Sequence, residues 1–184
     1  MRLRRSIFTA LVAAMLCLLA PISVPVGAVP VSLSIFGVCL AALISDRRGA
    51  LMALLLYVAL GAVGLPVFAG FSGGAQVLVG PTGGYLFGYI PMALCVSSFC
   101  RNGLRPLWRM AAGMILGLLF CYTLGCAWYA VSADISIGRA LLVGVLPFLP
   151  FDGIKLVAAG ALALLLRKRI DRFLTMDHKG EKGS

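Results

Sequence analysis

Charged side chains are scarce in this sequence. Only 12% of its 184 residues are charged, whereas 61% are hydrophobic, and the mean hydropathy is +1.05. A soluble domain is usually about a quarter charged, so these residues are too few to cover a surface that faces water. The composition therefore predicts an integral membrane protein in the lipid bilayer, folded as a single membrane domain over residues 1–184.

Histidine is almost absent, and the one that occurs, His178, lies in a polar tail. The cysteines form no C-x-x-C pair, and all lie inside apolar runs, at Cys17, Cys39, Cys95, Cys100, Cys121 and Cys126. A zinc or iron site needs clustered Cys or His ligands. We therefore expect no metal site and interpret the cysteines as buried residues at helix contacts.

Motifs for catalysis are also missing. The sequence contains no G-x-x-x-x-G-K-[ST], G-x-S-x-G or H-E-x-x-H pattern, so it predicts neither ATP hydrolysis through a phosphate loop nor a familiar hydrolase site. Without a suitable histidine, an activated nucleophile would need a rarer Ser–Lys pair. Lys155 has no evident serine partner, and we expect the chain not to be an enzyme.

Long apolar runs alternate with short polar turns. They predict an all-α, compact bundle of six transmembrane helices, followed by a tail at 168–184; the expected spans are about 6–22, 31–45, 50–65, 83–99, 110–131 and 151–167. With the N-terminus in the cytoplasm, fourteen of the sixteen Lys and Arg residues fall on the inside. Arg139 falls outside, and Lys155 lies within the last span.

This distribution of basic residues follows the positive-inside rule and predicts N-in/C-in topology for a multi-pass protein of a cell membrane. Five or seven spans would spoil it. It also accounts for the net charge of +10 without nucleic acid as a partner.

Two ionisable residues stand out near the start of the last predicted helix. Asp152 and Lys155 are three positions apart in FLPFDGIKLV, so they share one helix face. They have a structural interpretation, in which Asp152 caps the helix and Lys155 extends toward the interface. They also have a functional one, because a lysine and a helix N-terminus attract a carboxylate and an aspartate accepts hydrogen bonds from ligand N–H groups. The residues leave both open.

A glycine-rich, uncharged segment spans 64–84, with Gln76 as its one amide. Glycine permits close backbone approach, and Phe68, Phe71 and Tyr85 add aromatic faces in or beside the segment. These features are typical of a lid or pocket wall over a small, largely apolar ligand. An ordinary turn between two closely packed helices would have the same composition.

Small residues recur every four positions in three of the predicted helices. Ala10 and Ala14 share one face of the first, and further stripes lie in the fourth and fifth; these are Gly84 and Gly88, and Gly113, Gly117, Cys121 and Gly125. Such faces let helices approach closely. Internal packing is the expected use, with contact to a partner as the alternative.

Three stretches of the chain resemble the BioY family, the biotin-specific S-components of energy-coupling factor (ECF) transporters. They are VPVGAVPVSLSIF, the glycine-rich region with FAGFSGG and GPTGGY, and GVLPFLPFDGIKLVAAGAL. The resemblance covers about 6–166. It implies a six-helix subunit for biotin uptake that captures biotin at the outer face, without catalysis and without a cofactor. The implied partners are an ECF transmembrane coupling protein and two ABC-type ATPases.

The resemblance also implies roles for individual residues. Asp152, Lys155 and Gln76 would supply polar contacts to biotin, with the carboxylate facing Lys155. Phe71 and Tyr85 would form apolar walls.

Other parts of the chain complete this expectation. Gly74 would contact the ligand from the glycine-rich segment, and the loop at 24–31 would close over the site. Ala10 and Ala14 would meet the coupling protein, since they match the A-x-x-x-A pattern of the first S-component helix.

Three alternatives remain at this point. The first is an S-component for another vitamin, because fold alone does not settle a substrate. The second is an ion-coupled carrier or channel with Asp152 as a relay, which predicts further polar residues along a pore, whereas the last helix continues as LVAAGALALLL. The third is a purely structural membrane subunit, in which replacing Asp152 and Lys155 affects folding alone.

Overall fold

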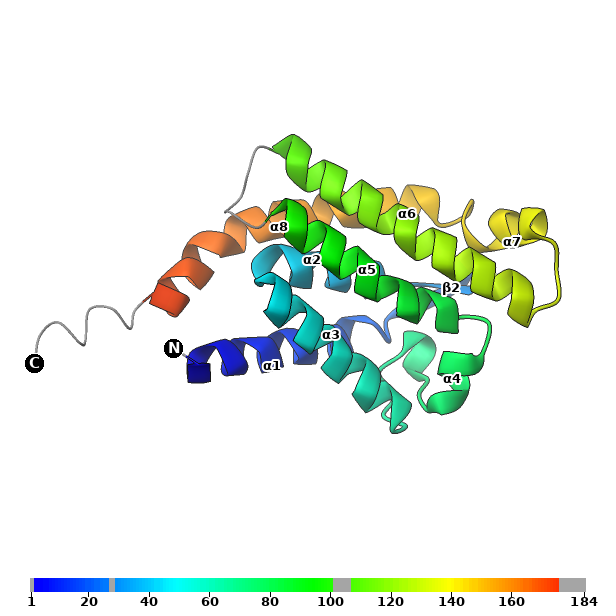
Figure 1. The fold of residues 1–184 in the computed structure, drawn as a ribbon, viewed down its shortest axis with the longest axis horizontal. Coiled ribbons are helices and arrows are strands. Elements are labelled where there is room, and N and C mark those ends of the chain that lie inside the picture. The colour runs from blue at the N-terminus through cyan, green and yellow to red at the C-terminus, as the bar shows by residue number, and fades with distance from the viewer. Residues whose placement is uncertain (1, 27–28, 101–106, 176–184) are drawn as a thin grey trace, which may run out of the picture.

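The fold is mostly helical in the computed structural model, which describes residues 2–26, 29–100 and 107–175 (Figure 1). In chain order its elements are α1 (Arg2–Leu19), β1 (Ser23–Val26), β2 (Val29–Ser32), α2 (Ser34–Ile44), α3 (Arg47–Ala62), the 3-10 helix η1 (Ala69–Phe71), α4 (Ala75–Val79), α5 (Gly83–Phe99), α6 (Leu107–Ser132), α7 (Ile137–Gly144) and α8 (Leu149–Thr175).

The expectation of an all-α bundle needs one correction, because β1 and β2 pair as an antiparallel hairpin. Val24 lies opposite Val31 and Pro25 opposite Pro30 in its register. Proline fixes φ and pushes the preceding residue into the extended region, so alternating Val and Pro residues favour a strand over a helix. The hairpin delays the second helix, which was expected from 31 and begins at Ser34.

The six longest helices follow the order of the predicted spans, with shifted ends. The third begins at Arg47 rather than 50, because Asp46 caps it and accepts a hydrogen bond from the Gly49 amide at 3.2 Å. The fourth predicted span, 83–99, coincides with α5. The tail expected from 168 begins as helix, since α8 continues to Thr175; its remainder, 176–184, lies outside the described residues.

Small residues bring α5 and α6 together, and these two helices form the most extensive helix pair. A Cβ added to Gly88 would lie 2.9 Å from the Cα of Cys121, and one added to Gly117 would lie 3.1 Å from the carbonyl oxygen of Met92. Real Cβ atoms do not approach a backbone atom as closely as the first distance. The predicted small-residue faces of these two helices therefore serve internal packing.

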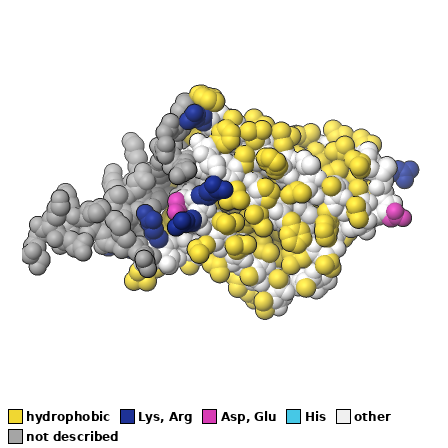
Figure 2. Space-filling view, in the orientation of Figure 1, with side chains coloured by type: hydrophobic (Ala, Val, Ile, Leu, Met, Phe, Trp, Pro, Cys, Tyr) yellow, Lys and Arg dark blue, Asp and Glu magenta, His cyan; other side chains and the backbone are white. Residues whose placement is uncertain are grey.

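Large hydrophobic side chains cover much of the outer surface (Figure 2). Within the described ranges, two helical segments are long and apolar enough to cross a membrane by length and composition; they are Leu107–Ser132 and Leu149–Leu166. The apolar helices α2 and α5 are shorter.

The two ends of the molecule differ in charge. Basic side chains gather toward the end where α1 begins, and the last turns of α8 approach the same end (Figures 1 and 2). Arg139 lies on α7, which Figure 1 places at the opposite end.

Candidate functional site

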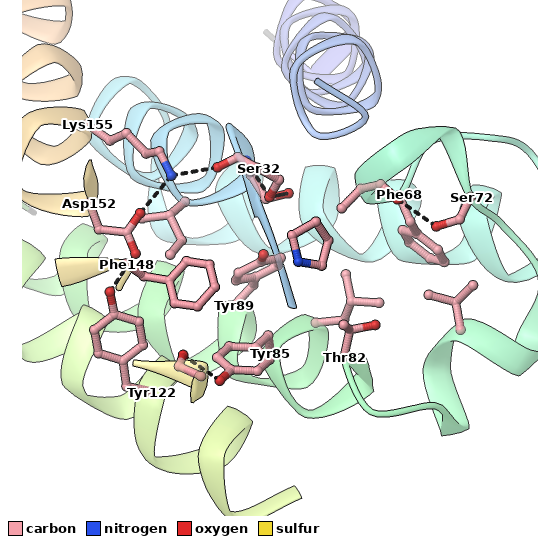
Figure 3. A pocket seen from close by; sticks show the side chains of 17 residues that line it. Ser32, Phe68, Ser72, Thr82, Tyr85, Tyr89, Tyr122, Phe148, Asp152 and Lys155 are labelled. Carbon is pink, nitrogen blue, oxygen red and sulfur yellow. Dashed lines mark hydrogen bonds and ion pairs between the residues drawn. The ribbon is translucent and has the colours of Figure 1, made fainter. Parts of the chain in front are cut away.

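A cavity lies toward the end of the molecule that holds α4, α7 and the β hairpin (Figure 3). Its walls come from β2, α2, the 65–82 segment, α5, α6, α7 and α8; the lining residues are Pro30, Ser32, Ser34, Ile35, Phe68, Ala69, Ser72, Val77, Thr82, Tyr85, Leu86, Tyr89, Tyr122, Gly144, Phe148, Asp152 and Lys155. The cavity volume is about 80 Å³. A single water needs roughly 10–15 Å³ on this measure, so the cavity has room for a small molecule.

One end of the cavity carries a buried ion pair. The Lys155 Nζ lies 2.7 Å from Asp152 Oδ1, and the two side chains are 11% and 1% exposed. Lys155 also donates to the backbone carbonyl of Ser32 at 2.7 Å, which connects α8 to β2. Tyr122 of α6 donates its hydroxyl to Asp152 Oδ2 at 2.5 Å. Three separate parts of the chain thus meet at one carboxylate and one ammonium.

These contacts bear on the structural interpretation, in which Asp152 caps the helix and Lys155 extends toward the interface. Asp152 lies in the first turn of α8, yet both its oxygens accept hydrogen bonds from side chains. Lys155 turns inward to the pair instead of extending toward the interface (Figure 3). An ion pair held inside an apolar bundle and open to a cavity is the arrangement expected of a ligand site.

Hydroxyl groups and aromatic rings form the middle of the cavity. Tyr85 donates a hydrogen bond from its hydroxyl to the carbonyl oxygen of Gly144 at 2.8 Å, which joins α5 to the end of α7. Ser32 donates its hydroxyl to that of Ser34 at 2.8 Å. Tyr89 and Phe148 flank these groups in Figure 3. The middle therefore offers flat apolar faces with a few polar atoms.

The other end of the cavity is built by the segment between α3 and α5. Phe68 is 1% exposed and packs edge-on against Tyr57, with ring centroids 5.5 Å apart. Its amide donates to the Ser72 carbonyl at 2.9 Å, and the Gly70 amide donates to the Pro21 carbonyl at 3.1 Å. Backbone hydrogen bonds thus hold this wall in place beside the hairpin.

Comparison with known proteins identifies the family. The sequence model of the BioY family matches residues 1–172. This chain belongs to the BioY family.

Relatives of this BioY family member cover most of its length. It is 44% identical over 167 residues to the biotin transporter BioY of Thermotoga maritima, across 90% of this chain and 95% of that one. It is 39% identical over 144 residues to a probable biotin transporter BioY of Pyrococcus horikoshii, across 78% and 84%. Transporters are membrane proteins, so these relatives agree with the integral membrane protein that the scarcity of charged residues predicts.

The fold has a counterpart among solved structures. The S-component for biotin from an ECF-type ABC transporter superposes with a TM-score of 0.83 over 91% of this chain and 92% of that one, at 23% identity. That likeness shows the S-component fold for this BioY family member.

Three residues of the expected site lie away from the cavity of this BioY family member. Gln76 is exposed, and its Nε2 donates to the Gly73 carbonyl at 2.9 Å. Phe71 is 69% exposed. Gly74 has φ +99° and donates its amide to Gly61 at 2.7 Å, as the residue that precedes α4. The single turn of α4 points Val77 to the cavity instead of Gln76.

The remaining expected site residues meet in the cavity, together with several that the sequence did not single out. Asp152, Lys155 and Tyr85 line it. Tyr122 also lines it and belongs to no motif, but a tyrosine in the middle of an apolar span is itself a signal, because its buried hydroxyl needs a partner. Ser32 contributes through its backbone carbonyl, which no side-chain pattern reveals.

The part of the chain that the structure describes contains no group of three or more His, Cys, Asp or Glu side chains that could hold a metal ion.

Proposed function

We propose that this chain is the biotin-binding S-component of an ECF transporter, and that the cavity beside Asp152 and Lys155 is its biotin site. The observation that carries this proposal is a buried ion pair facing an apolar and aromatic cavity. The relatives named as biotin transporters support it, as does the likeness to the S-component for biotin. The role is binding and transport of biotin, not catalysis.

The charge at the ion pair favours biotin's ureido group over its carboxylate. The pair is formally neutral, because Lys155 balances Asp152. A ligand carboxylate beside it would place a second negative charge in a buried site, which is costly. A ureido group is neutral and has two N–H donors and one carbonyl acceptor. Its donors suit Asp152, and its carbonyl suits Lys155.

The carboxylate of biotin then points toward the other end of the cavity. Hydroxyl groups of Ser72 and Thr82 line that end, and Lys155 is the one basic side chain among the lining residues. This assignment revises the expectation that the carboxylate meets Lys155. Tyr85, Tyr89 and Phe148 supply the apolar walls between the two ends.

The outward position of the cavity follows from the proposed topology. Six helices span the bilayer with both termini in the cytoplasm of the cell, so the basic end of the molecule lies inside and the cavity opens outside. The eleven residues of α2 extend only about 16 Å of the roughly 30 Å apolar thickness. The β hairpin completes the crossing, which is tolerated where non-helical backbone lines a cavity.

The coupling protein contacts the exposed face of α1 in this proposal. Ala10 and Ala14 are exposed, whereas Val12, Ala13 and Leu16 of the same helix are buried in the bundle. The two small residues leave a shallow path along α1 for an approaching helix. Two ABC-type ATPases would complete the transporter.

Calorimetry tests the proposal directly. The purified protein in detergent is titrated with biotin, riboflavin and thiamin. We expect one-to-one binding of biotin alone. Binding of another vitamin instead would keep the S-component role and change the substrate. A folded protein that binds none of the three would contradict the assignment of the cavity.

A further inference from the structure

Tyr122 has a contact that the proposed function does not use. Its hydroxyl donates to Asp152 Oδ2 at 2.5 Å, within the range of hydrogen bonds to an ionised acceptor. The other oxygen, Oδ1, accepts from Lys155 at 2.7 Å. The carboxylate is 1% exposed. Each of its oxygens therefore has one protein donor, and the two donors come from different helices.

This arrangement fixes a group that would otherwise turn. The terminal torsion of an aspartate is broad, so one bond from Lys155 leaves the carboxylate plane free to rotate about its axis. A second donor on the opposite oxygen holds that plane. Each carboxylate oxygen has about two lone-pair directions, and one on each remains after Tyr122 and Lys155 have taken theirs. The carboxylate can thus present fixed acceptors to a ligand.

We propose that Tyr122 is a positioning residue for the ligand: its hydroxyl sets the orientation of the Asp152 carboxylate and so makes the site selective for ligands with N–H donors. The inference rests on the proposed biotin site. Tyr122 itself lines the cavity through its ring. Its hydroxyl is committed to Asp152, so it acts on the ligand through that carboxylate.

Charge strengthens the same argument. A buried carboxylate needs hydrogen-bond donors in place of the water it has lost, and within the described contacts Asp152 has two side-chain donors, Tyr122 and Lys155. Lys155 also binds the Ser32 carbonyl, so it divides its donors between the pair and the hairpin. Tyr122 serves the carboxylate alone. Without it, the ligand meets a looser and less well satisfied acceptor.

Substitution of Tyr122 by Phe removes the hydroxyl and keeps the ring. We expect the dissociation constant for biotin to rise roughly tenfold, as for the loss of one hydrogen bond to a charged group. Tyr129→Phe is the matched control, because Tyr129 is buried on the same helix and lies outside the cavity lining. We expect its affinity for biotin to equal that of the wild type.

A double-mutant cycle separates positioning from a structural role. In Asp152→Asn, the amide oxygen faces Lys155 and the amide nitrogen faces Tyr122, so the hydroxyl no longer donates to this side chain. Asn keeps an acceptor for the ligand, and binding is followed to millimolar biotin. We expect Tyr122→Phe to change the affinity less than about twofold in this background, because interacting residues are not additive.

The outcomes are distinct. If the wild type binds biotin and Tyr122→Phe binds it equally well, the inference is wrong and the biotin site stands. If Tyr122→Phe weakens biotin binding equally in the wild type and in Asp152→Asn, Tyr122 acts on the structure in general and the inference is wrong. If the wild type binds no biotin, the proposed function and this inference fall together. If Tyr122→Phe unfolds, biotin binding by the folded double variant decides: an affinity within about twofold of Asp152→Asn supports the inference, and a further loss of affinity contradicts it.

Discussion

The two ends of the cavity are built in different ways. At the charged end, side chains from α6 and α8 hold one another, with Asp152 accepting from Tyr122 and Lys155. At the opposite end, Phe68 and Gly70 are fixed by backbone hydrogen bonds to Ser72 and Pro21. Function at the first end depends on polar atoms, so removal of one side-chain group should abolish a hydrogen bond. Function at the second end depends on close packing, so one added methyl group should displace the wall. Substitutions at the two ends should therefore fail in different ways.

The largest effect is expected at the charged end, for Asp152→Ala. This change leaves the Lys155 ammonium buried without its counter-ion, which typically costs about 3–5 kcal/mol of folding free energy. It also removes the acceptor for the ureido N–H groups. We expect a marked fall in the unfolding temperature in detergent and loss of biotin binding by calorimetry.

The double variant Asp152→Ala with Lys155→Ala sharpens this test. Removal of both charges takes away the uncompensated ammonium, so stability should recover in part while biotin binding stays absent. Asp134→Asn is the control for loss of an exposed carboxylate and should match the wild type in both measurements. A stable Asp152→Ala variant with unchanged biotin affinity would contradict the roles given to the pair.

The next effect is expected at the other end, for Gly61→Ala. A Cβ at Gly61 would overlap the Phe68 ring, and the ring is buried against Tyr57. The ring must move, and overpacking of this kind costs about 1–3 kcal/mol. We expect lower thermal stability and weaker biotin binding, because Phe68 is part of the cavity wall. Gly138→Ala is the control, since nothing lies within 4 Å of its added Cβ.

The same contrast explains what the sequence could predict. The sequence singles out Asp152 and Lys155, which line the cavity, because ionisable residues are rare in an apolar run and a spacing of three gives one helix face. The sequence predicts both ends of α5, because a glycine-rich stretch precedes it and basic residues follow it along the chain. Charge and periodicity are local properties of a sequence, so they can be recognised without knowledge of the fold.

The orientation of the glycine-rich segment could not be predicted from local patterns of charge and periodicity. Gln76 was the one amide in 64–84 and was expected in the site, but α4 is a single turn whose orientation depends on backbone bonds to distant residues. Gly74 reaches Gly61 through its amide, and Gly70 reaches Pro21. Neither bond leaves a side-chain pattern. The β hairpin differs from the expected loop at 24–31 for a related reason, because its backbone pairing depends on two segments meeting and the Val–Pro alternation also suits a loop.

A small effect is expected for the two exposed residues of that segment. Gln76→Ala and Phe71→Ala remove side chains that lie outside the cavity, and exposed substitutions usually change stability by less than about 0.5 kcal/mol. Each variant should bind biotin within about twofold of the wild type in calorimetry. A loss of tenfold or more in Gln76→Ala would show that α4 turns its amide into the site when biotin binds.

The smallest effect is expected from a change in the ligand rather than in the protein. With the ureido group at Asp152 and Lys155, the carboxylate of biotin lies near Ser72 and Thr82 and meets no basic lining side chain. Biotin amide, which replaces that carboxylate by a neutral group of similar size, should therefore bind with the same affinity as biotin, since no ion pair is lost. Competition between the two ligands for the purified protein measures the ratio. Desthiobiotin, which keeps both the ureido group and the carboxylate, is the control for changes elsewhere in the ligand. A loss of a hundredfold for the amide alone would return the carboxylate to Lys155 and reverse the orientation argued from the neutral ion pair.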